Sequence, residues 1–312
     1  MRVSVCMAIY NGIRFIEQQL ECIRKQTRKP DEVILCDDGS TDGTGEFLRK
    51  YLEQNQDTTG WKLFLNEENR GYPGNFYHAM SLCTGDIVFL ADQDDLWDLR
   101  KIGRMCEKMV RYREIRVLCC TFRLIDGADE TIHTVMAPAA RRGSGEVRQV
   151  SVEQVFYKCE WPGMVLAYRN DWYRSEVKQS VHKIPHDFLL CARAAEEHGF
   201  FQLEECLAFH RRHESNAGGE EHRIGRLLKK ERKLKEIAEY KRILNCFSDE
   251  EVMRTEEGKA ALWRKQRSMQ GRYEALRSGK SGAVLGNAWR HRREVRLATL
   301  ICDLAIVKQR KN

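Results

Sequence analysis

Short apolar runs alternate along the first half of the chain with longer segments whose apolar positions recur every three or four residues. The short runs are typical of buried strands, and the longer segments are typical of helices with one buried face. The pattern predicts strands at 3–9, 32–36, 61–65 and 86–91, and helices at 13–23, 41–54 and 73–83. Thr41 or Asp42 is suited to the N-cap of the second helix. Strands alternating with helices of this length predict an α/β fold with a mostly parallel central sheet covered on both faces.

The second half is less regular. It predicts a strand at 117–125, a helix at 187–198 and an extended segment at 203–210. Residues 137–145 combine Pro, Gly and an Arg pair, which favours a mobile loop. Beyond Gly218 and Gly219 the chain changes to long basic, helix-favouring segments. We therefore expect a domain at 1–219 and a basic helical C-terminal extension at 220–312.

Composition excludes several classes of protein. Apolar residues make up 42% of the chain and charged residues 32%, which suffices for a packed core and argues against disorder. No apolar run approaches the roughly 18 residues of a membrane span. The N-terminal residues predict a strand rather than a signal peptide, so we expect a cytoplasmic protein. The twelve cysteines lie mostly in apolar runs without a Cys-x-x-Cys pair, which predicts reduced core thiols rather than disulfides or a zinc ribbon.

Charge is unevenly distributed along the chain. Residues 220–312 hold 24 Lys and Arg against 13 Asp and Glu, a balance of +11, whereas the remainder has a balance of −4. Apolar residues of 223–242 fall roughly on one side of a basic helix, and a second basic stretch at 289–296 precedes an apolar run. Such a tail suits an anionic membrane surface; alternatively it packs on the domain at 1–219 or builds a homodimer. We expect no nucleic-acid partner, because no recognisable nucleic-acid module accompanies the charge.

The strongest chemical signal is the segment Asp92-Gln93-Asp94-Asp95, which directly follows an apolar strand. Three carboxylates so close together repel one another unless a cation binds them. Oxygen ligands of this kind suit Mg²⁺ or Mn²⁺, which keep positions free for substrate phosphates. The alternative is an acidic turn in contact with solvent.

Two further polar pairs, Tyr10-Asn11 and Asp37-Asp38, also follow predicted strands and should meet along one rim of the sheet. An aromatic ring can stack on a nucleotide base, and a carboxylate can accept a hydrogen bond from one. Both pairs also precede glycine, so turn formation is the alternative reading. No glycine-rich dinucleotide fingerprint or P-loop is present.

Several segments in order resemble glycosyltransferase family 2, whose members use nucleotide-sugar donors on a GT-A fold. They are VSVCMAIYNG (3–12), DEVILCDDGSTDGT (31–44), NRGYPGNF (69–76), TGDIVFLADQDDLW (84–97), WPGMVLAYR (161–169), HDFLL (186–190) and FHRRHESNAGG (209–219). The resemblance covers about 3–219 and implies a nucleotide-sugar half at about 1–97 and an acceptor half at about 98–219. The DQDD-Leu-Trp form most resembles rhamnosyltransferase-like members that decorate bacterial surface polysaccharides.

The resemblance also implies residue roles around the donor. Residues that match the nucleotide- and donor-binding positions, with their immediate neighbours, are Ala8, Tyr10, Asn11, Asp37, Asp38, Arg70, Asn75, Asp92, Gln93 and Arg212. Residues that match the metal-binding D-x-D motif, or accompany it, are Asp92, Asp94, Asp95 and His213. His213 could instead be structural. The run 209–213 departs from the Tyr-Arg-x-His of relatives, which leaves the register of the arginine open.

The remaining implied roles concern the acceptor. Asp187 matches the catalytic base, although a carboxylate at a helix start can also act as a cap. His186 would orient the acceptor or face solvent. Trp161 and Gly163 would form a platform for a sugar, or Trp161 would pack at a turn.

Together these features predict an inverting, Mn²⁺- or Mg²⁺-dependent glycosyltransferase. The expected donor is dTDP-rhamnose or a UDP-hexose, and the expected acceptor is a glycan or lipid-linked glycan, in bacterial surface polysaccharide synthesis. Docking of the tail would place the enzyme at the inner face of the cell membrane. A nucleotidyltransferase and a non-catalytic glycan-binding relative are the alternatives.

Overall fold

The structure is a computed structural model that describes residues 1–132, 143–158, 161–177, 183–213, 229–249 and 251–308. The chain divides into two compact units. The first unit comprises 1–150 and 160–212, and the second comprises 151–159 and 213–312. The predicted boundary at Gly218 and Gly219 lies outside the described residues, as does most of the predicted loop at 137–145.

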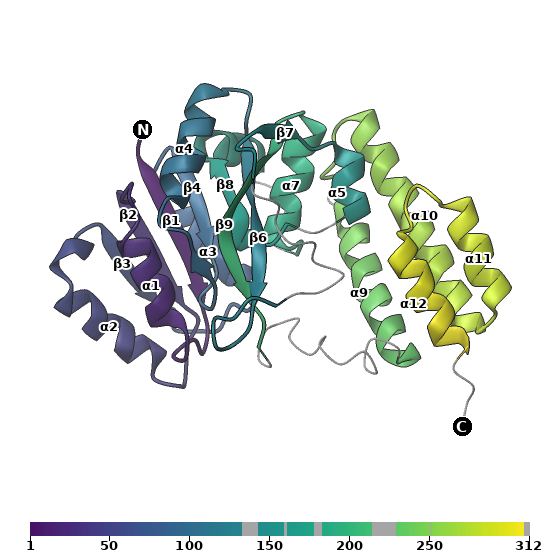
Figure 1. Cartoon of the computed structure of the whole chain (residues 1–312), viewed down its shortest axis with the longest axis horizontal. Coiled ribbons are helices and arrows are strands. Elements are labelled where there is room, and N and C mark those ends of the chain that lie inside the picture. Colours follow the sequence, from purple (N-terminus) through teal and green to yellow (C-terminus); the bar gives the residue numbers. More distant parts are fainter. Residues whose placement is uncertain (133–142, 159–160, 178–182, 214–228, 250, 309–312) are drawn as a thin grey trace. The chain divides into compact units, whose positions relative to one another are not determined.

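The first unit begins with the predicted alternation of strands and helices, shown from purple to blue in Figure 1. Its elements are β1 (Val3–Ile9), α1 (Ile16–Arg24), β2 (Glu32–Asp37), α2 (Thr44–Gln54), β3 (Trp61–Leu65), α3 (Gly74–Leu82) and β4 (Ile87–Ala91). These four strands are parallel and lie in the order β3-β2-β1-β4. The chain therefore reverses its direction of winding between β1 and β4, and in such sheets a ligand binds beyond the carboxyl ends of the strands at that point.

The sheet continues with antiparallel and parallel pairs, so it is mixed as a whole. The further elements are β5 (Leu96–Trp97), α4 (Lys101–Arg111), β6 (Val117–Ile125), β7 (Val147–Gln149), β8 (Leu166–Arg169), α6 (Asn170–Trp172), α7 (His186–Glu196) and β9 (Phe200–Arg211). Strand β8 joins β4 to β6 through two antiparallel pairings, and β9 lies between β6 and β5. Short turns at Gln56–Thr58, Gly163–Val165 and Tyr173–Val177 complete the unit.

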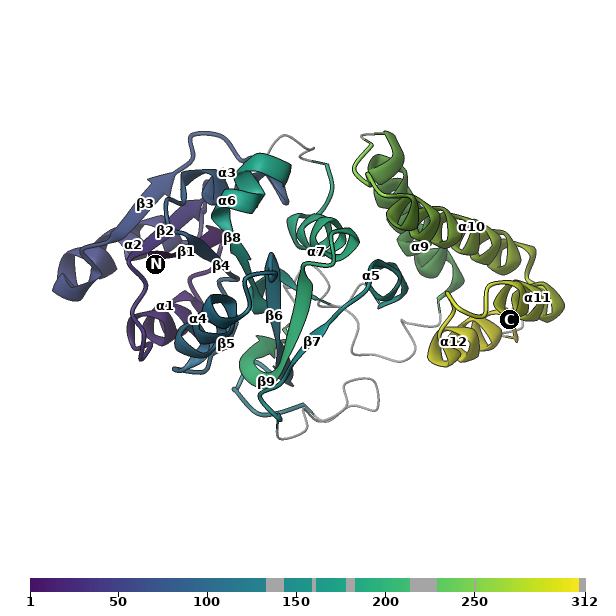
Figure 2. The ribbon, with the colours of Figure 1, turned by 90° about the horizontal axis from the view of Figure 1, so that it is seen from above.

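Burial explains why the central strands have continuous apolar sequences. Every residue of β2 and β4 is buried, and only Ala8 of β1 is partly accessible. Figure 2 shows α1 and α4 on one face of the sheet and α3 and α7 on the other. The α/β fold predicted from the apolar runs is confirmed.

Two predicted helix boundaries are wrong by about one turn. Ile13 precedes α1 and is 41% exposed, so it is not part of the buried helical face. Helix α2 begins at Thr44 with Gly43 as its N-cap, rather than with Thr41 or Asp42. The carboxylate of Asp42 instead accepts hydrogen bonds from the backbone N–H groups of Ile13 and Thr44, at 3.2 and 3.1 Å. Asp42 thus links the loop between β1 and α1 to the loop between β2 and α2, and the helix begins after it, at Thr44.

The described cysteines confirm the prediction of core thiols. Each of them is a free thiol, and most are buried, including Cys6 and Cys36 in the central strands. Burial raises the pKa of Cys36 to about 12, which keeps the thiol protonated and unreactive.

The second unit is helical, as the sequence predicts for the C-terminal extension. It contains α5 (Val152–Lys158), α9 (Lys230–Asp249), α10 (Glu256–Ser278), α11 (Ser281–Arg290) and α12 (Leu297–Lys308) (Figure 1). The apolar side of α9 is buried at Ile237, Leu244 and Phe247, and Phe247 contacts Phe156 of α5 with ring centroids 5.7 Å apart. Within the described residues, no helix combines the length and apolar character that crossing a membrane requires.

Candidate active site

Three loops meet at the carboxyl ends of β1, β2 and β4, where the sequence places its candidate donor-binding residues. In the sheet register Ile9 pairs with Asp37, and Met7 pairs with Ala91. Tyr10, Asp38 and Asp92 therefore begin the loops at one edge of the sheet. Ala8 lies just below this edge and pairs with Cys36.

The side chain of Gln93 spans the point where the winding reverses. Its Oε1 accepts a hydrogen bond from the backbone N–H of Tyr10 at 2.8 Å, and its Nε2 donates to the Tyr10 carbonyl at 2.9 Å. A Cβ on Gly12 would lie 2.6 Å from Gln93 Oε1, so a larger residue there would displace the Gln93 side chain from these hydrogen bonds. Gln93 thus holds the Tyr10 loop, while half of the Tyr10 surface remains exposed (50%) and available for stacking.

Asn11 joins the first two loops. Its backbone has a left-handed φ of 50°, which asparagine tolerates better than most residues. Its N–H donates to Ser40 Oγ at 2.8 Å, and its Oδ1 accepts from the Thr41 N–H at 2.8 Å. The structure thus places Asn11 in turn formation.

The carboxylate of Asp38 is buried and accepts three hydrogen bonds from the β3–α3 loop. The donors are Asn66 Nδ2 at 2.7 Å and the backbone N–H groups of Arg70 and Gly71 at 2.9 and 2.8 Å. Asp38 therefore fixes this loop. Neighbouring Asp37 is also buried and accepts hydrogen bonds from Ser40, and burial raises the pKa of its carboxyl group.

Asn75 and Arg70 lie on or beside that loop in different environments. Asn75 is buried; its Nδ2 donates to the Cys36 carbonyl at 2.9 Å, and its Oδ1 accepts from Asn66 at 2.9 Å. Arg70 is exposed. Asn75 therefore supports the rim from below, whereas the guanidinium of Arg70 is accessible to a ligand.

The acidic segment after β4 divides into accessible and buried carboxylates. Asp92 and Asp94 are partly accessible, whereas Asp95 is fully buried. Asp95 Oδ1 accepts the backbone N–H of Arg211 at 2.7 Å and lies 3.0 Å from His210 Nδ1. Burial, together with the nearby carboxylates of Asp95, Asp94 and Asp187, raises the pKa of Asp92. Asp95 anchors the segment to β9 through Oδ1, whereas its buried Oδ2 has no hydrogen-bond partner among the described residues. Asp92 and Asp94 are the accessible candidate ligands, and the predicted part of Asp95 in the metal site stays a prediction.

The carboxylates fit a divalent cation that takes few ligands from the protein. Among the described residues, no three His, Cys, Asp or Glu side chains form a ready-made metal cluster. Two carboxylates completed by substrate phosphates and water are a common arrangement for Mg²⁺. His213 belongs to the second unit, so its predicted role as a further ligand stays a prediction.

Sequence reasoning missed Arg211. Its guanidinium is buried, donates through Nε to the Asp94 carbonyl at 2.7 Å and through Nη2 to Gln18 Oε1 at 2.9 Å, and lies 4.6 Å from the Phe15 ring centroid. Arg212, the residue chosen from the resemblance, is only partly buried. The departure of 209–213 from the family pattern was the signal that the register of this arginine was open.

A second missed residue is Lys101, which lies beneath the acidic segment. Its Nζ is buried, donates to the Met164 carbonyl and lies 3.5 Å from the Trp97 ring centroid. Burial lowers the pKa of Lys101 to about 8. The negative charges of Asp95 and Asp92 act in the opposite direction to burial and raise the pKa of Lys101, so the ammonium lies within electrostatic reach of the acidic segment.

Asp187 is the second residue of α7, and the N-cap position is occupied by Pro185. Its Oδ1 accepts the N–H of Phe188 at 2.7 Å, and the Tyr72 hydroxyl donates a further hydrogen bond to its carboxylate. Burial raises the pKa of Asp187 to about 6, despite these hydrogen bonds and one from its own backbone N–H. The group is thus ionised at neutral pH yet basic enough to accept a proton. Tyr72 was not found by sequence reasoning.

His186 is buried in an aromatic cluster, so the alternative in which it faces solvent is wrong. Its ring stacks on Phe76 with centroids 3.9 Å apart, and the edge of Tyr72 approaches it at 5.7 Å. Burial lowers the pKa of His186 to about 3, so the imidazole is neutral. Gly163 permits this packing, because a Cβ there would lie 2.8 Å from His186 Nε2.

Trp161 packs against β9. Its Nε1 donates to Gln202 Oε1 at 3.2 Å, and its ring meets Phe200 edge-on at 5.2 Å. These contacts favour the packing role over the acceptor platform.

Comparisons with known proteins identify the family. Residues 4–162, about half of the chain, match the family model described as glycosyl transferase family 2. The chain therefore belongs to glycosyltransferase family 2.

Curated relatives carry related descriptions. A putative glycosyltransferase, EpsE, from Bacillus subtilis is 35% identical over 38% of this chain and 41% of its own length. An uncharacterized glycosyltransferase from Nostoc is 28% identical over 55% of this chain and 52% of its own length. The chain thus spans about half the length of these relatives.

Solved structures confirm the GT-A type fold. The structure is similar to Staphylococcus aureus TarS 1–349 in complex with UDP, with a TM-score of 0.61 and 18% identity over 88% of this chain and 72% of that one. It is also similar to the mannosyltransferase PcManGT from Pyrobaculum calidifontis in complex with GDP-Man and Mn²⁺, with a TM-score of 0.56 and 19% identity over 98% and 85% of the two chains.

Proposed function

We propose that the protein is an inverting glycosyltransferase that uses a divalent cation and a nucleoside-diphosphate sugar. The observation that carries this proposal is the set of carboxylates at one edge of the sheet. Asp187 contributes to the electrostatic environment of Asp92, although the two lie in different segments of the chain. Glycosyl transfer of this kind requires a base close to a bound cation, and Asp187 and the pair Asp92 and Asp94 would supply these two groups.

In the proposed reaction Asp187 accepts the proton of the acceptor hydroxyl as that oxygen attacks the anomeric carbon. The bond from that carbon to the nucleoside diphosphate breaks in the same step, which inverts the configuration. Asp92 and Asp94 would hold Mn²⁺ or Mg²⁺, which supplies charge stabilisation to the departing diphosphate. Tyr10 stacks on the base of the donor, and Arg70 meets its phosphates.

The proposed donor is dTDP-rhamnose or a UDP-hexose. Support for a nucleotide sugar comes from the fold: the similar structures of TarS and PcManGT are described in complex with UDP-GlcNAc and with GDP-Man. The rhamnose proposal rests on the resemblance of the DQDD-Leu-Trp segment.

The proposed acceptor is a glycan or a lipid-linked glycan in the synthesis of a bacterial surface polysaccharide, assembled at the cytoplasmic face of the membrane. One relative, WfgD from Escherichia coli, is described as a glucosyltransferase acting on GlcNAc-diphosphoundecaprenol, and it is 31% identical over 35% of this chain.

The test is incubation with a panel of dTDP-, UDP- and GDP-sugars in the presence of Mn²⁺ and a mixture of glycan acceptors. Release of nucleoside diphosphate supports the proposal. Release of pyrophosphate would instead identify a nucleotidyltransferase, and glycan binding without turnover would identify a non-catalytic relative. A thermal-shift screen of nucleoside diphosphates selects the base first, because a ligand of the native state raises the melting temperature.

Asp94→Ala tests the role of the cation, and Asp57→Ala is its control. Asp94→Ala should abolish transfer without unfolding the protein, whereas Asp57→Ala, at a carboxylate that pairs with Arg24 at the surface, should retain activity. Near-normal transfer by Asp94→Ala in the presence of EDTA would refute the role of the cation.

A further inference from the structure

Helices α11 and α12 carry large apolar side chains on their outer surfaces. Leu285 and Trp289 of α11 are 50% and 75% exposed, and Leu297 and Ile301 of α12 are 73% and 58% exposed. Each pair is four residues apart, so its members lie on the same side of their helix. These four residues are here called the α11–α12 outer face.

The sides of α11 and α12 that face each other are known from a small cavity that both helices line. Val284 and Asn287 of α11 and Leu300 and Asp303 of α12 line one small cavity, so these sides of the helices converge. Figures 1 and 2 show the two helices next to one another and beside α10. The four exposed residues lie on the remaining sides, directed away from that shared cavity.

Helix α12 is apolar on nearly all sides, because Asp303 and Lys308 are its only charged residues, and Ile306 is buried together with Asp303. Asp303 is buried and forms a two-pronged ion pair with Arg272 of α10, at 2.7 and 2.9 Å, while apolar residues face outward. Leu297 and Ile301 on the same side as the exposed Lys308 give the helix an apolar outer side with a cation near its end. Large exposed apolar side chains of this kind mark a surface that contacts a membrane or another protein rather than water alone.

Charge around the outer face is almost entirely positive. Residues 281–312 hold seven Lys and Arg but only two acids, Glu294 and Asp303. Both acids pair inside the unit, Glu294 with Arg264 at 3.8 Å and Asp303 with Arg272. The exposed residues Arg290, Arg292 and Arg293, in contrast, have no acidic partner among the described residues.

We propose that the α11–α12 outer face docks on an anionic lipid bilayer, with Trp289, Leu297 and Ile301 entering the interface and the neighbouring arginines meeting phosphate headgroups. The face combines the two contributions that hold a peripheral helix, namely apolar area and attraction to anionic lipid. The twelve residues of α12 are too few for a span of about 20 residues, so the helix lies in the surface. A second copy of the chain is a poorer occupant, since its arginines would repel those of the first.

The sequence already indicates the basic stretch at 289–296 and the apolar run after it, and the structure adds which of their side chains are exposed. Of the other basic stretch, at 223–242, residues 223–228 lie outside the described residues, and in the described part Ile237 is buried within the second unit. The proposed docking extends the membrane location proposed above, but its test does not depend on transferase activity.

The experiment is sedimentation of the full-length protein with vesicles of phosphatidylcholine, with and without phosphatidylglycerol. We expect binding to the anionic vesicles, weaker binding at high salt and no binding to pure phosphatidylcholine. Trp289→Gln should lower the partition coefficient about tenfold, which corresponds to about 1.4 kcal/mol. Arg292→Gln combined with Arg293→Gln should lower it roughly thirtyfold, or about 2 kcal/mol, at about 1 kcal/mol per cation.

Matched controls separate docking from general effects. Trp263→Gln removes another exposed tryptophan, on α10, and Arg49→Gln with Arg113→Gln removes two exposed cations from the first unit. All three control substitutions should leave vesicle binding near that of the wild type. Equal loss in the control and test variants, or wild-type protein that stays in the supernatant with anionic vesicles at low salt, would overturn the proposal. A dimer that Trp289→Gln dissociates, without any change in vesicle binding, would identify a second copy as the occupant and overturn it as well.

Discussion

At the scale of single residues, environment rather than identity decides what each carboxylate does. Asp38 fixes a loop and Asp95 fixes β9. The carboxylate of Asp187 accepts hydrogen bonds from the backbone N–H groups of Phe188 and of Asp187 itself and from the Tyr72 hydroxyl. Burial raises the pKa of Asp187 to about 6, which suits a proton acceptor.

The first prediction concerns the pH dependence of the proposed base. Because Asp187 must be ionised to accept a proton, the turnover rate should rise through a midpoint near pH 6 and level off above it. The Tyr72 hydroxyl lowers the pKa of Asp187, so Tyr72→Phe should move the midpoint to higher pH. Steady-state rates between pH 5 and pH 9, about the range that brackets such a group, measure this.

Two further variants complete this test. Asp187→Asn should lower kcat by at least about 10², with little change in donor affinity. Tyr112→Phe, a tyrosine at the end of α4, should leave the midpoint unchanged. A midpoint that does not move in Tyr72→Phe would show that the tyrosine has no electrostatic link to the base.

A second prediction concerns the loop that Asp38 holds. In Asp38→Asn one acceptor oxygen becomes a donor. If Oδ2 is replaced, the new NH₂ group faces the Gly71 N–H, and if Oδ1 is replaced it faces the Arg70 N–H and Asn66 Nδ2. We expect a loss of roughly 1–3 kcal/mol in the free energy of unfolding, because buried donors lose their acceptor, together with weaker nucleoside diphosphate binding. Chemical denaturation and calorimetry measure the two effects, and Glu68→Gln, an exposed change in the same loop, is the control. Unchanged stability would leave Asp38 with the base-binding role alone.

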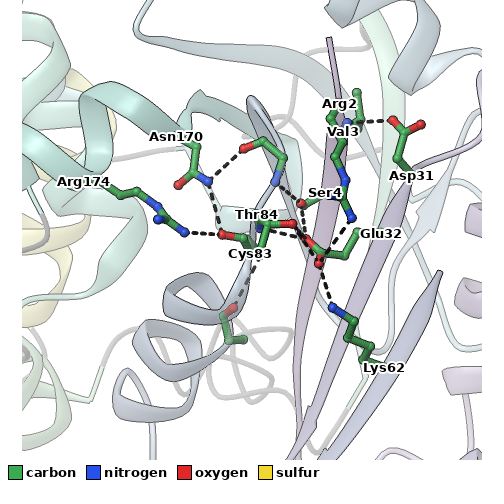
Figure 3. Close-up of polar contacts among 12 residues, drawn as sticks. Arg2, Val3, Ser4, Asp31, Glu32, Lys62, Cys83, Thr84, Asn170 and Arg174 are labelled. Carbon is green, nitrogen blue, oxygen red and sulfur yellow. Dashed lines mark hydrogen bonds and ion pairs between the residues drawn. The ribbon is translucent and has the colours of Figure 1, made fainter.

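At the scale of elements, the carboxyl ends and the amino ends of the parallel strands have different roles. The carboxyl edge carries the candidate site, and the amino edge is closed by a polar cluster around Glu32 (Figure 3). Glu32 is buried at the start of β2 and accepts from Ser4 Oγ at 2.6 Å, the Thr84 N–H at 2.8 Å and Lys62 Nζ at 3.2 Å. These bonds join β1, β2, β3 and the segment before β4.

The third prediction concerns this cluster. Burial alone would raise the pKa of Glu32, but the hydrogen bonds from Ser4 and Thr84 and the Lys62 ammonium lower it below its ordinary value of 4.5. The stability that the ionised group supplies is therefore complete at neutral pH and is lost as pH falls below about 4.5. Glu32→Gln should cost roughly 1–3 kcal/mol near pH 7 and progressively less in acid, as measured by denaturant unfolding.

The control for this variant is Glu46→Gln, which removes an exposed carboxylate that pairs with Lys50 on α2. It should leave stability nearly unchanged at both pH values. A destabilisation by Glu32→Gln that is the same at pH 3.5 as at about pH 7 would contradict the electrostatic role.

The elements also show how far a sequence can predict such a site. Alternating apolar runs located β1 to β4, and parallel strands bring their carboxyl ends together, so the meeting of Tyr10, Asp38 and Asp92 could be predicted. The roles of Arg211, Lys101 and Tyr72 could not, because each arises from packing between distant segments. Arg211, for example, is separated from its acceptor at Asp94 by 117 residues.

At the scale of the whole molecule, the two units do not follow the order of the chain. The segment 151–159 joins the second unit, although the residues on either side of it belong to the first. Phe156 of α5 is fully buried and contacts Phe247, Arg264 pairs with Glu153 at 3.3 Å, and Lys265 Nζ donates to the Tyr157 carbonyl at 3.5 Å. The C-terminal helices therefore pack against segment 151–159, which connects the two parts of the first unit along the chain.

The last prediction is that the C-terminal helices cannot be removed without damage. A chain that ends at Arg212 would leave α5 without the Phe247 and α10 contacts. Exposure of Phe156 alone would cost roughly 1.5–3 kcal/mol and create an apolar patch that favours aggregation. In the full chain, Phe247→Ala should destabilise the second unit by roughly 3–5 kcal/mol, whereas Trp263→Ala, at an exposed position of the same unit, should have a small effect. Thermal unfolding and light scattering measure these changes. A protein of residues 1–212 that is monomeric and unfolds cooperatively at the temperature of the full chain would show that α5 needs no partner.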